Sequence, residues 1–331
     1  MNVSEIGEFG LIDLLSKMIS DSETPQHGPH PPVIGIGDDA AAWQGDPAIQ
    51  LATVDTMVQN IHFSLETTPW KELGWKSISI NLSDIAAMGG KPDFALVALA
   101  LPETVQVEDV TLLYQGMMEA ARLFNLSIIG GNLSRSPVVS VTITVIGSSP
   151  EGKILRRSTA LPGDMIAVTG YPGSAAAGPE MLTQNRSFEP DTAAYLRNAF
   201  LHPMPRIVEG NILVKHDITT AIDTSDGLLA DLRHICEASH VSARVNTSLV
   251  PIHESVREFY GERATEVALS EGEDYELLFT GTDEKFDKIR SLMSCPVTII
   301  GDIMGGEPGK IDLVDAEGNS IEINRTGWEH F

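Results

Sequence analysis

Strand-like and helix-like segments alternate along this chain, and that alternation restricts its fold more than any other feature. Short apolar or β-branched runs, typical of buried strands, are separated by longer segments with apolar residues at helical spacing. The predicted strands are 33–36, 50–54, 94–101, 126–129, 138–147, 165–169, 219–222 and 277–280. The predicted helices are 4–18, 69–88, 108–124 and a helix that ends at Glu237. This order predicts an α/β fold with mixed sheets.

The length predicts two domains. With 331 residues the chain exceeds the usual size of one domain. The pattern of strands and helices restarts after the polar turn at 148–152. We therefore predict an N-terminal α/β domain at 1–149 and a C-terminal α/β domain at 150–331.

The charge excludes several classes of partner. The chain has 46 acidic and 22 basic residues, for a net charge of −24, so it repels nucleic acid and anionic membranes. No apolar run approaches the ~20 residues of a membrane span, and no basic-then-apolar leader is present. The only cysteines, Cys236 and Cys295, are too few for a disulfide framework. We expect a cytoplasmic protein that binds neither nucleic acid nor membrane.

Carboxylates recur where predicted strands end, on a predicted buried helix and at glycine turns. They are Asp38, Asp39, Asp55, Asp84, Asp223 and Asp226. Each cluster alone is also compatible with a solvated turn, and a lone His62 with a structural histidine. An aspartate such as Asp84 within an apolar helix nevertheless needs a partner.

Together, these carboxylates predict magnesium chemistry. Hard oxygen ligands without neighbouring histidine or cysteine suit Mg²⁺ better than zinc or copper. Magnesium ions held by aspartates can neutralise a polyphosphate, so an acidic protein can bind ATP and transfer a phosphoryl group without a lysine-bearing phosphate loop. The glycine-rich turn 170–178 could bind an anion at a helix N-terminus, and the polar turn expected at 130–136 could do so with backbone amides. The turn 170–178 is neither a Walker A loop nor a dinucleotide-binding fingerprint.

Longer motifs containing these residues are spread along nearly the whole chain. They are Gly35-Ile-Gly-Asp38-Asp39-Ala, Asp55-Thr-Met-Val with His62-Phe63, Asn81-Leu-Ser-Asp84-Ile-Ala-Ala-Met-Gly, Pro162-Gly-Asp164, Asp223-Thr-Ser225-Asp226-Gly-Leu, Gly272-Glu273-Asp274-Tyr275-Glu276-Leu and Trp328-Glu-His-Phe331. Their identity and order resemble the thiamine-monophosphate kinase family.

The resemblance implies a homodimer of the aminoimidazole ribonucleotide synthetase superfamily that converts ATP and thiamine monophosphate to ADP and thiamine diphosphate. The substrate's own phosphate oxygen would be the nucleophile, so no catalytic side chain is implied. The implied magnesium site comprises Asp39, Thr53, the Val54 backbone, Asp55, Asp84, Asn132, Asp223 and Asp226. The implied ATP contacts are Gly131, Asn132, Arg157 and Ser225, and the implied substrate contacts are His62, Glu273 and Trp328.

One position departs from the family pattern. The family commonly has Gly-Gly-Asp-Thr-Thr-Arg where this chain has Gly130-Gly-Asn132-Leu-Ser134-Arg135. Asn132 still offers a carbonyl oxygen but removes one negative charge. We expect weaker binding of the magnesium ion at that position.

Other functions within and outside the superfamily remain alternatives. The absence of any cysteine before Cys236 argues against a selenophosphate synthetase, and the lack of a C-terminal cysteine argues against a hydrogenase maturation factor. A purine-type synthetase fits the segment 272–277 less well. A homologue that binds Mg-ATP without catalysis is the alternative of another class.

Overall fold

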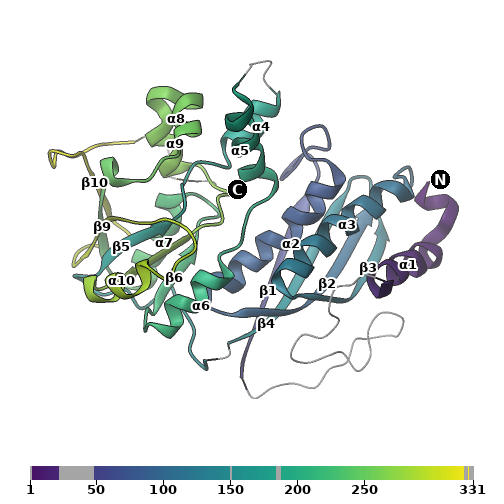
Figure 1. The fold of residues 1–331 in the computed structure, drawn as a ribbon, viewed down its shortest axis with the longest axis horizontal. Coiled ribbons are helices and arrows are strands. Elements are labelled where there is room, and N and C mark those ends of the chain that lie inside the picture. The colour runs from purple at the N-terminus through teal and green to yellow at the C-terminus, as the bar shows by residue number, and fades with distance from the viewer. Residues whose placement is uncertain (1, 22–47, 150, 184–187, 324–326, 328–331) are drawn as a thin grey trace. The chain divides into compact units, whose positions relative to one another are not determined.

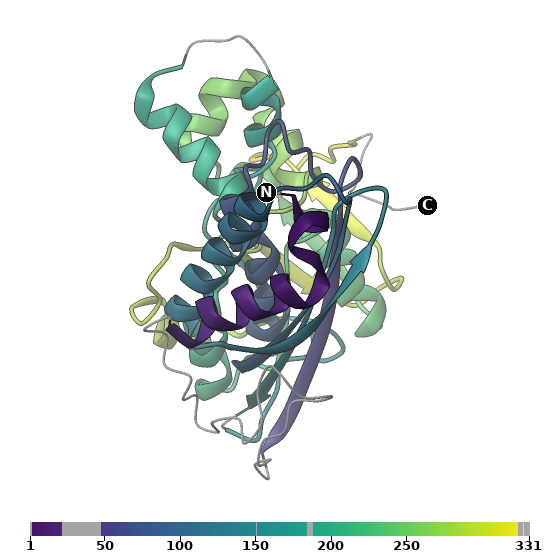
Figure 2. The same ribbon diagram turned by 90° about the vertical axis from the view of Figure 1, so that its right-hand side faces the viewer.

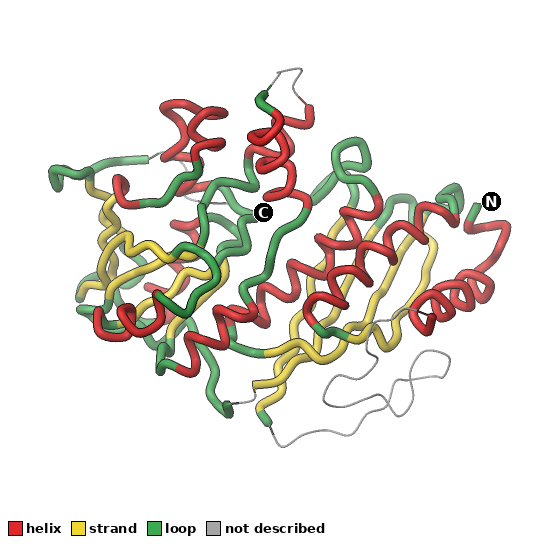
Figure 3. Tube along the Cα trace, in the orientation of Figure 1, coloured by secondary structure: helices red, strands yellow, loops and turns green. Residues whose placement is uncertain are grey.

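The computed structural model describes residues 2–21, 48–149, 151–183, 188–323 and 327 (Figure 1). The chain forms two compact units: unit 1 comprises Met1–Ile85 and Lys91–Pro150, and unit 2 comprises Ala86–Gly90 and Glu151–Phe331. Both units contain helices and strands (Figure 3). Among the described residues, no helix has the length and apolar character needed to cross a membrane.

Unit 1 is a four-stranded sheet with helices on one face (Figures 1 and 2). The strand order is β1-β4-β2-β3; β4 is antiparallel to both β1 and β2, and β2 is parallel to β3. The elements are α1 (Val3–Asp21), β1 (Ile49–Val58), α2 (Trp70–Ala87), β2 (Lys91–Leu101), α3 (Val107–Phe124), β3 (Ser127–Arg135) and β4 (Ser140–Ser149).

Helices α2 and α3 pack closely against each other because each has a glycine at the point of contact. A Cβ atom at Gly74 would lie 1.9 Å from the carbonyl oxygen of Leu113, and one at Gly116 would lie 1.8 Å from that of Lys71. The buried faces of both helices, including Leu82 and Met117, pack on the sheet. This crossing fixes α2, which carries the Asn81–Asp84 motif, against the sheet.

The two faces of the unit 1 sheet differ in exposure. In β4, alternate residues from Val141 onward are buried and those between them are half-exposed, as the twofold period of a strand requires. The face turned away from α2 and α3, which we call the open face, carries Ala52, Val54, Thr56, Leu96, Ala98, Ala100, Asn132, Thr142, Thr144 and Ile146. In the described part of unit 1, no helix packs on this face (Figure 2).

Unit 2 is a six-stranded mixed sheet between two groups of helices. The strand order is β10-β7-β9-β5-β8-β6, and only the β10–β7 pair is parallel. Its strands are β5 (Met165–Thr169), β6 (Thr220–Asp223), β7 (Ser242–Asn246), β8 (Leu277–Gly281), β9 (Val297–Met304) and β10 (Ile311–Val314). Its α-helices are α4 (Ala177–Thr183), α5 (Pro190–Leu201), α6 (Ile207–Lys215), α7 (Leu228–Ala238), α8 (Glu254–Tyr260), α9 (Ala264–Ser270) and α10 (Asp283–Arg290), and short 3₁₀ turns lie at Thr247–Leu249 and Gly261–Arg263.

Each face of this sheet has its own apolar core. Ile166 and Val168 of β5 pack with residues of α7, α8 and α9, whereas Ala167 packs with residues of α6, α10 and the end of α2. The mixed sheets and the helices beside them confirm the predicted α/β class.

One local prediction is wrong: the expected turn at 130–136 is instead a continuation of strand β3 as far as Arg135. This segment pairs with β2 from Leu96↔Gly130 to Leu101↔Arg135. Glycine fits here because a Cβ atom at Gly131 would lie 1.9 Å from the carbonyl oxygen of Val97. Polar residues are tolerated because β3 is an edge strand whose residues here are largely exposed. The predicted strand at 33–36 lies outside the described residues.

Candidate functional site

Strand β1 and helix α2 in unit 1 bring three predicted metal ligands together. Thr53 and Asp55 share one face of β1 because side chains alternate along a strand. The hydroxyl of Thr53 donates to Oδ2 of Asp84 at 2.5 Å. The structure therefore places Thr53, Asp55 and Asp84 side by side, with all three side chains partly exposed. The side chain of Val54 is 59% exposed on the open face.

Asn81 explains how α2 is held at this strand. Its side chain is fully buried, its Oδ1 accepts a hydrogen bond from the Asp55 amide at 3.0 Å, and its Nδ2 donates to the Ser77 carbonyl at 3.1 Å. Strand β1 is a sheet edge, so the Asp55 amide is satisfied by a side chain in place of a neighbouring strand. Asn81 thus fixes the main chain of one predicted metal ligand.

His62 follows β1 with a defined tautomer. Its Nδ1 accepts from the Val58 amide at 3.0 Å, so the neutral ring carries its proton on Nε2. The ring is half-exposed. The ring therefore presents an N–H group, not a lone pair, at Nε2.

Asn132 and Gly131 lie at the other edge of the sheet. The ladder Thr56–Thr142–Ala98–Asn132 lies on the open face, whereas the ladder that contains Asp55, Ile143 and Val97 faces the helices. Three strand spacings separate β1 from β3, about 14 Å. Within one chain the structure does not bring Asn132 to Asp55 and Asp84.

In unit 2, the turn 223–227 joins β6 to α7 and carries three predicted ligands. Asp223 is buried, whereas Ser225 and Asp226 are partly exposed. Gly227 has a φ of +123°, and a Cβ atom there would lie 2.7 Å from the carbonyl oxygen of Ser270. Only glycine adopts this conformation in the space available, so the chain can turn sharply from strand to helix.

The segment 272–276 is hydrogen-bonded to this turn along its main chain. The amides of Glu273 and Tyr275 donate to the carbonyls of Ser225 and Thr224, both at 2.9 Å, and the Thr224 amide donates to the Glu276 carbonyl at 2.8 Å. Glu273 and Tyr275 have φ values of +68° and +53°, a conformation that non-glycine residues hold only under constraint. The structure thus brings Glu273 beside Ser225, close to Asp223 and Asp226.

A further carboxylate, Asp231, lies beside the same turn. It is 1% exposed, and burial, followed by the negative charges of Asp223 and Asp226, raises its pKa to about 8. One ligand atom each of Asp226, Asp231 and the exposed His234 lie within 4.8 Å of one another. A divalent cation would relieve this crowding, and carboxylate oxygens are the donors that Mg²⁺ prefers. The residues present therefore fit the predicted metal.

The other two acidic residues of the 272–276 segment are structural. Oδ2 and Oδ1 of Asp274 accept from the amides of Gly173 at 2.6 Å and Ala175 at 2.9 Å. These amides of the glycine-rich turn therefore bind a carboxylate of the same chain, not an external anion. Glu276 forms a two-point ion pair with Arg206, from Nε at 2.6 Å and Nη2 at 2.5 Å, and accepts from the Thr169 hydroxyl at 2.5 Å.

The remaining predicted residues are not placed with these groups. The Arg157 carbonyl accepts a hydrogen bond from the Ser239 hydroxyl at 2.8 Å. Ser239 lies just after the end of α7, whereas Ser225 lies just before the start of this helix. The 11 residues of α7 span about 16 Å, so Arg157 and Ser225 lie at opposite ends of that helix. Asp38, Asp39 and Trp328 lie outside the described residues.

Sequence reasoning missed Asp231 as a member of this group and did not assign Asn81 a role. The available signal was the same for both: a polar residue at a buried position of an otherwise apolar helix face, close to an acidic motif.

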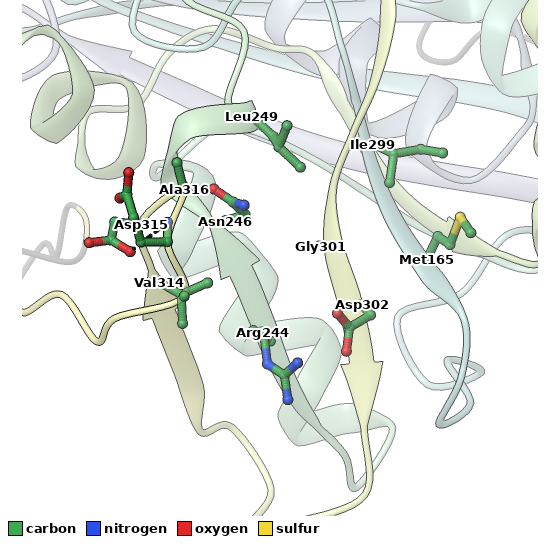
Figure 4. Close-up of a pocket in the computed structure, with 12 residues that line it drawn as sticks. Met165, Arg244, Asn246, Leu249, Ile299, Gly301, Asp302, Val314, Asp315 and Ala316 are labelled. Carbon is green, nitrogen blue, oxygen red and sulfur yellow. Dashed lines mark hydrogen bonds between the residues drawn. The ribbon is translucent and has the colours of Figure 1, made fainter.

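A cavity of about 740 Å³ in unit 2 is lined by none of the predicted site residues (Figure 4). Arg244 of β7 and Asp302 of β9 are neighbours in the sheet and lie at one end of it. The Oδ1 atom of Asn246, another lining residue, already accepts hydrogen bonds from the amide and hydroxyl of Ser248. The cavity is distinct from the turns at 223–227 and 272–276.

Family models and a curated protein match nearly the whole chain. The models for AIR synthase related protein, N-terminal and C-terminal domains, match residues 37–149 and 162–314. The thiamine-monophosphate kinase of Bacillus subtilis (strain 168) is 36% identical over 321 residues, 94% of this chain and 97% of that protein.

Two solved structures are similar over almost the whole chain. The crystal structure of thiamine-monophosphate kinase from Stenotrophomonas maltophilia K279a has a TM-score of 0.81 and 34% identity, covering 95% of this chain and 98% of that chain. AaThiL complexed with AMPPCP and TMP has a TM-score of 0.77 and 31% identity, covering 100% and 99%.

Proposed function

The chain belongs to the thiamine-monophosphate kinase family, and from that premise we propose that it transfers the terminal phosphoryl group of ATP to thiamine monophosphate by direct, magnesium-assisted in-line displacement. The nucleotide and acceptor are supported by AaThiL, a relative at 31% identity whose structure is a complex with AMPPCP and TMP. The products are ADP and thiamine diphosphate.

One observation carries the proposal: the hydrogen-bonded pair of segments 223–227 and 272–276. It holds the carboxylates of Asp223 and Asp226 beside Ser225 and Glu273. A purine-type synthetase or a protein that only binds Mg-ATP would also need the carboxylates. The additional placement of Glu273 favours an acceptor with a positive charge, such as the thiazolium ring of thiamine monophosphate.

The chain offers magnesium ligands in each unit. In unit 1 these are Asp55, Asp84 and Thr53, and in unit 2 they are Asp223 and Asp226. The resemblance adds Asp39 and the Val54 carbonyl. When bound, Mg²⁺ neutralises the charge of the polyphosphate.

The chain's own residues bind and orient the substrates. His62, with its proton on Nε2, donates to the anionic acceptor, and the Ser225 hydroxyl contacts ATP. The family resemblance assigns Trp328 to the acceptor site and Arg157 and Gly131 to ATP binding, and the proposal includes these assignments. No side chain needs to remove a proton, because the phosphate of thiamine monophosphate is already ionised at neutral pH.

The reaction balances without a covalent enzyme intermediate. A phosphate oxygen of thiamine monophosphate attacks the γ-phosphorus of ATP, the bond from that phosphorus to the bridging oxygen breaks, and ADP leaves with the bridging oxygen. Positioning and charge neutralisation supply the rate enhancement.

We also propose that the protein is a homodimer and that the open face of unit 1 meets a second copy. This face carries apolar and small side chains, and Val54 on it is 59% exposed. Asn132 lies on the same face and far from Asp55 of its own chain, which suits a role toward the second copy. Val54→Glu should yield a monomer by light scattering, and an unchanged mass would refute this arrangement. The cytoplasmic location stays a prediction.

The test is ADP release by the purified protein with ATP, magnesium and thiamine monophosphate, with controls that lack the acceptor or the metal. Release that needs both supports the kinase. Release with a purine-pathway acceptor in place of thiamine monophosphate would support a synthetase. ATP binding without release on any acceptor would support the non-catalytic homologue.

A further inference from the structure

We propose that Asp231 is a positioning residue of the metal site, because its carboxylate holds the main chain that presents Asp226. This inference rests on the proposed function. Asp231 has no proposed contact with a substrate, and it belongs to none of the motifs that support the family resemblance.

The contacts of Asp231 define the role. Its Oδ2 accepts from the amides of both Asp226 and Gly227, each at 3.2 Å. These two amides precede the first turn of α7, where no intrahelical acceptor is available. A buried carboxylate therefore fixes two consecutive peptide groups at the residue whose side chain is a predicted ligand.

The main chain at Asp226 is held from two directions. On one side Asp231 accepts its amide. On the other side the Ser225 carbonyl accepts from the Glu273 amide at 2.9 Å. Gly227 is confined by the Ser270 carbonyl, and removing the Asp231 side chain would take away the acceptor of the Asp226 and Gly227 amides.

Asp231 differs from an ordinary helix cap, because it lies within α7 (Leu228–Ala238) and its side chain accepts from the turn that precedes the helix. A neutral asparagine would offer the same kind of acceptor oxygen. The proposed role of Asp231, which is 1% exposed, therefore lies in its acceptor oxygen and not in its charge.

The experiment uses the full-length protein with Asp231→Ala, Asp231→Leu and Asp231→Asn, and Glu237→Ala as the matched control. Glu237 is an exposed acid on the same helix. Mn²⁺ binding is measured by electron paramagnetic resonance without substrates, and the Mg²⁺ concentration for half-maximal turnover is measured separately. Circular dichroism and thermal melting confirm that each variant is folded.

Loss of a residue that orients a metal ligand typically weakens metal binding about 10- to 100-fold. We expect Asp231→Ala and Asp231→Leu to weaken Mn²⁺ binding and raise the half-saturating Mg²⁺ by at least about 10-fold. Asp231→Asn keeps an acceptor oxygen and should restore most of the affinity, and Glu237→Ala should match the wild type.

Wild-type Mn²⁺ affinity in a folded Asp231→Ala or Asp231→Leu variant would overturn the inference, even if its melting temperature were lower. Failure of Asp231→Asn to restore affinity would also overturn it, because the role would then belong to the charge. The proposed function fails separately, through absence of thiamine monophosphate-dependent ADP release by the wild type, and Mn²⁺ binding tests Asp231 in either case.

Discussion

Replacing Arg206 should lower the free energy of unfolding of unit 2, by an amount that follows from the ion pair of Arg206 with Glu276. Arg206 and Glu276 are 21% and 10% exposed and are joined at two points. Breaking a buried pair from one side costs about 3–5 kcal/mol because the other charge is left without its partner. Glu276 keeps the Thr169 hydroxyl, so we place Arg206→Met at the lower end, about 3 kcal/mol.

That cost is measurable by urea denaturation and by calorimetry. For a unit of 150–250 residues, 1 kcal/mol shifts the melting temperature by about 2–4 °C, so we expect a decrease of roughly 6–12 °C. The double variant Arg206→Met/Glu276→Gln removes the unpaired charge and should recover most of the loss. A single variant within about 1 kcal/mol of wild type, or a double variant less stable than the single one, would refute the reasoning.

Three further predictions address the site and its supports. Asp55→Asn or Asp226→Asn should abolish turnover in a folded protein, and full activity in either variant would remove that residue from the mechanism. Asn132→Asp should lower the Mg²⁺ concentration needed for half-maximal turnover, and an unchanged magnesium dependence would show that the missing charge does not matter. Burial raises the pKa of Asp274 to about 7, so the native state binds more protons than the unfolded state between about pH 4 and 7, and its contribution to stability falls as pH rises through that range. Relative to Asp274→Asn, the wild type should lose roughly 1–2 kcal/mol of unfolding free energy between pH 5 and 7, measured by urea denaturation. This is less than the full linkage value because the side chain is partly exposed. A stability difference between the two proteins that does not change with pH would contradict this.

Local patterns were sufficient for the elements with strong periodicity. The helix predicted at 69–88 is α2 at Trp70–Ala87, and the strand predicted at 138–147 is β4 at Ser140–Ser149. In both, apolar spacing and end signals agree. The strands β7, β9 and β10 were not predicted. In β7 the exposed Arg244 interrupts a short buried run, and most residues of β9 and β10 are half-buried, so the alternation is weak and only pairing within the sheet resolves it.

The sequence was sufficient to predict which types of residue the candidate site contains. It was not sufficient to predict which of them lie next to one another. The strand-to-helix turn at 223–227 is a local feature and could be located from the sequence. The meeting of Glu273 with Ser225 depends on backbone hydrogen bonds between distant segments, which no local pattern encodes. For the same reason the glycine-rich turn 170–178 suggested an external anion, although its amides bind Asp274.

The most direct test of the proposed reaction is to follow the phosphoryl group itself. The protein is incubated with magnesium, thiamine monophosphate and ATP labelled with ¹⁸O in the γ-phosphoryl group, and the products are analysed by mass spectrometry. We predict thiamine diphosphate that carries the label in its terminal phosphoryl group, in amounts equal to the ADP formed. Labelled inorganic phosphate with no labelled thiamine diphosphate would contradict the proposal that this protein is a thiamine-monophosphate kinase.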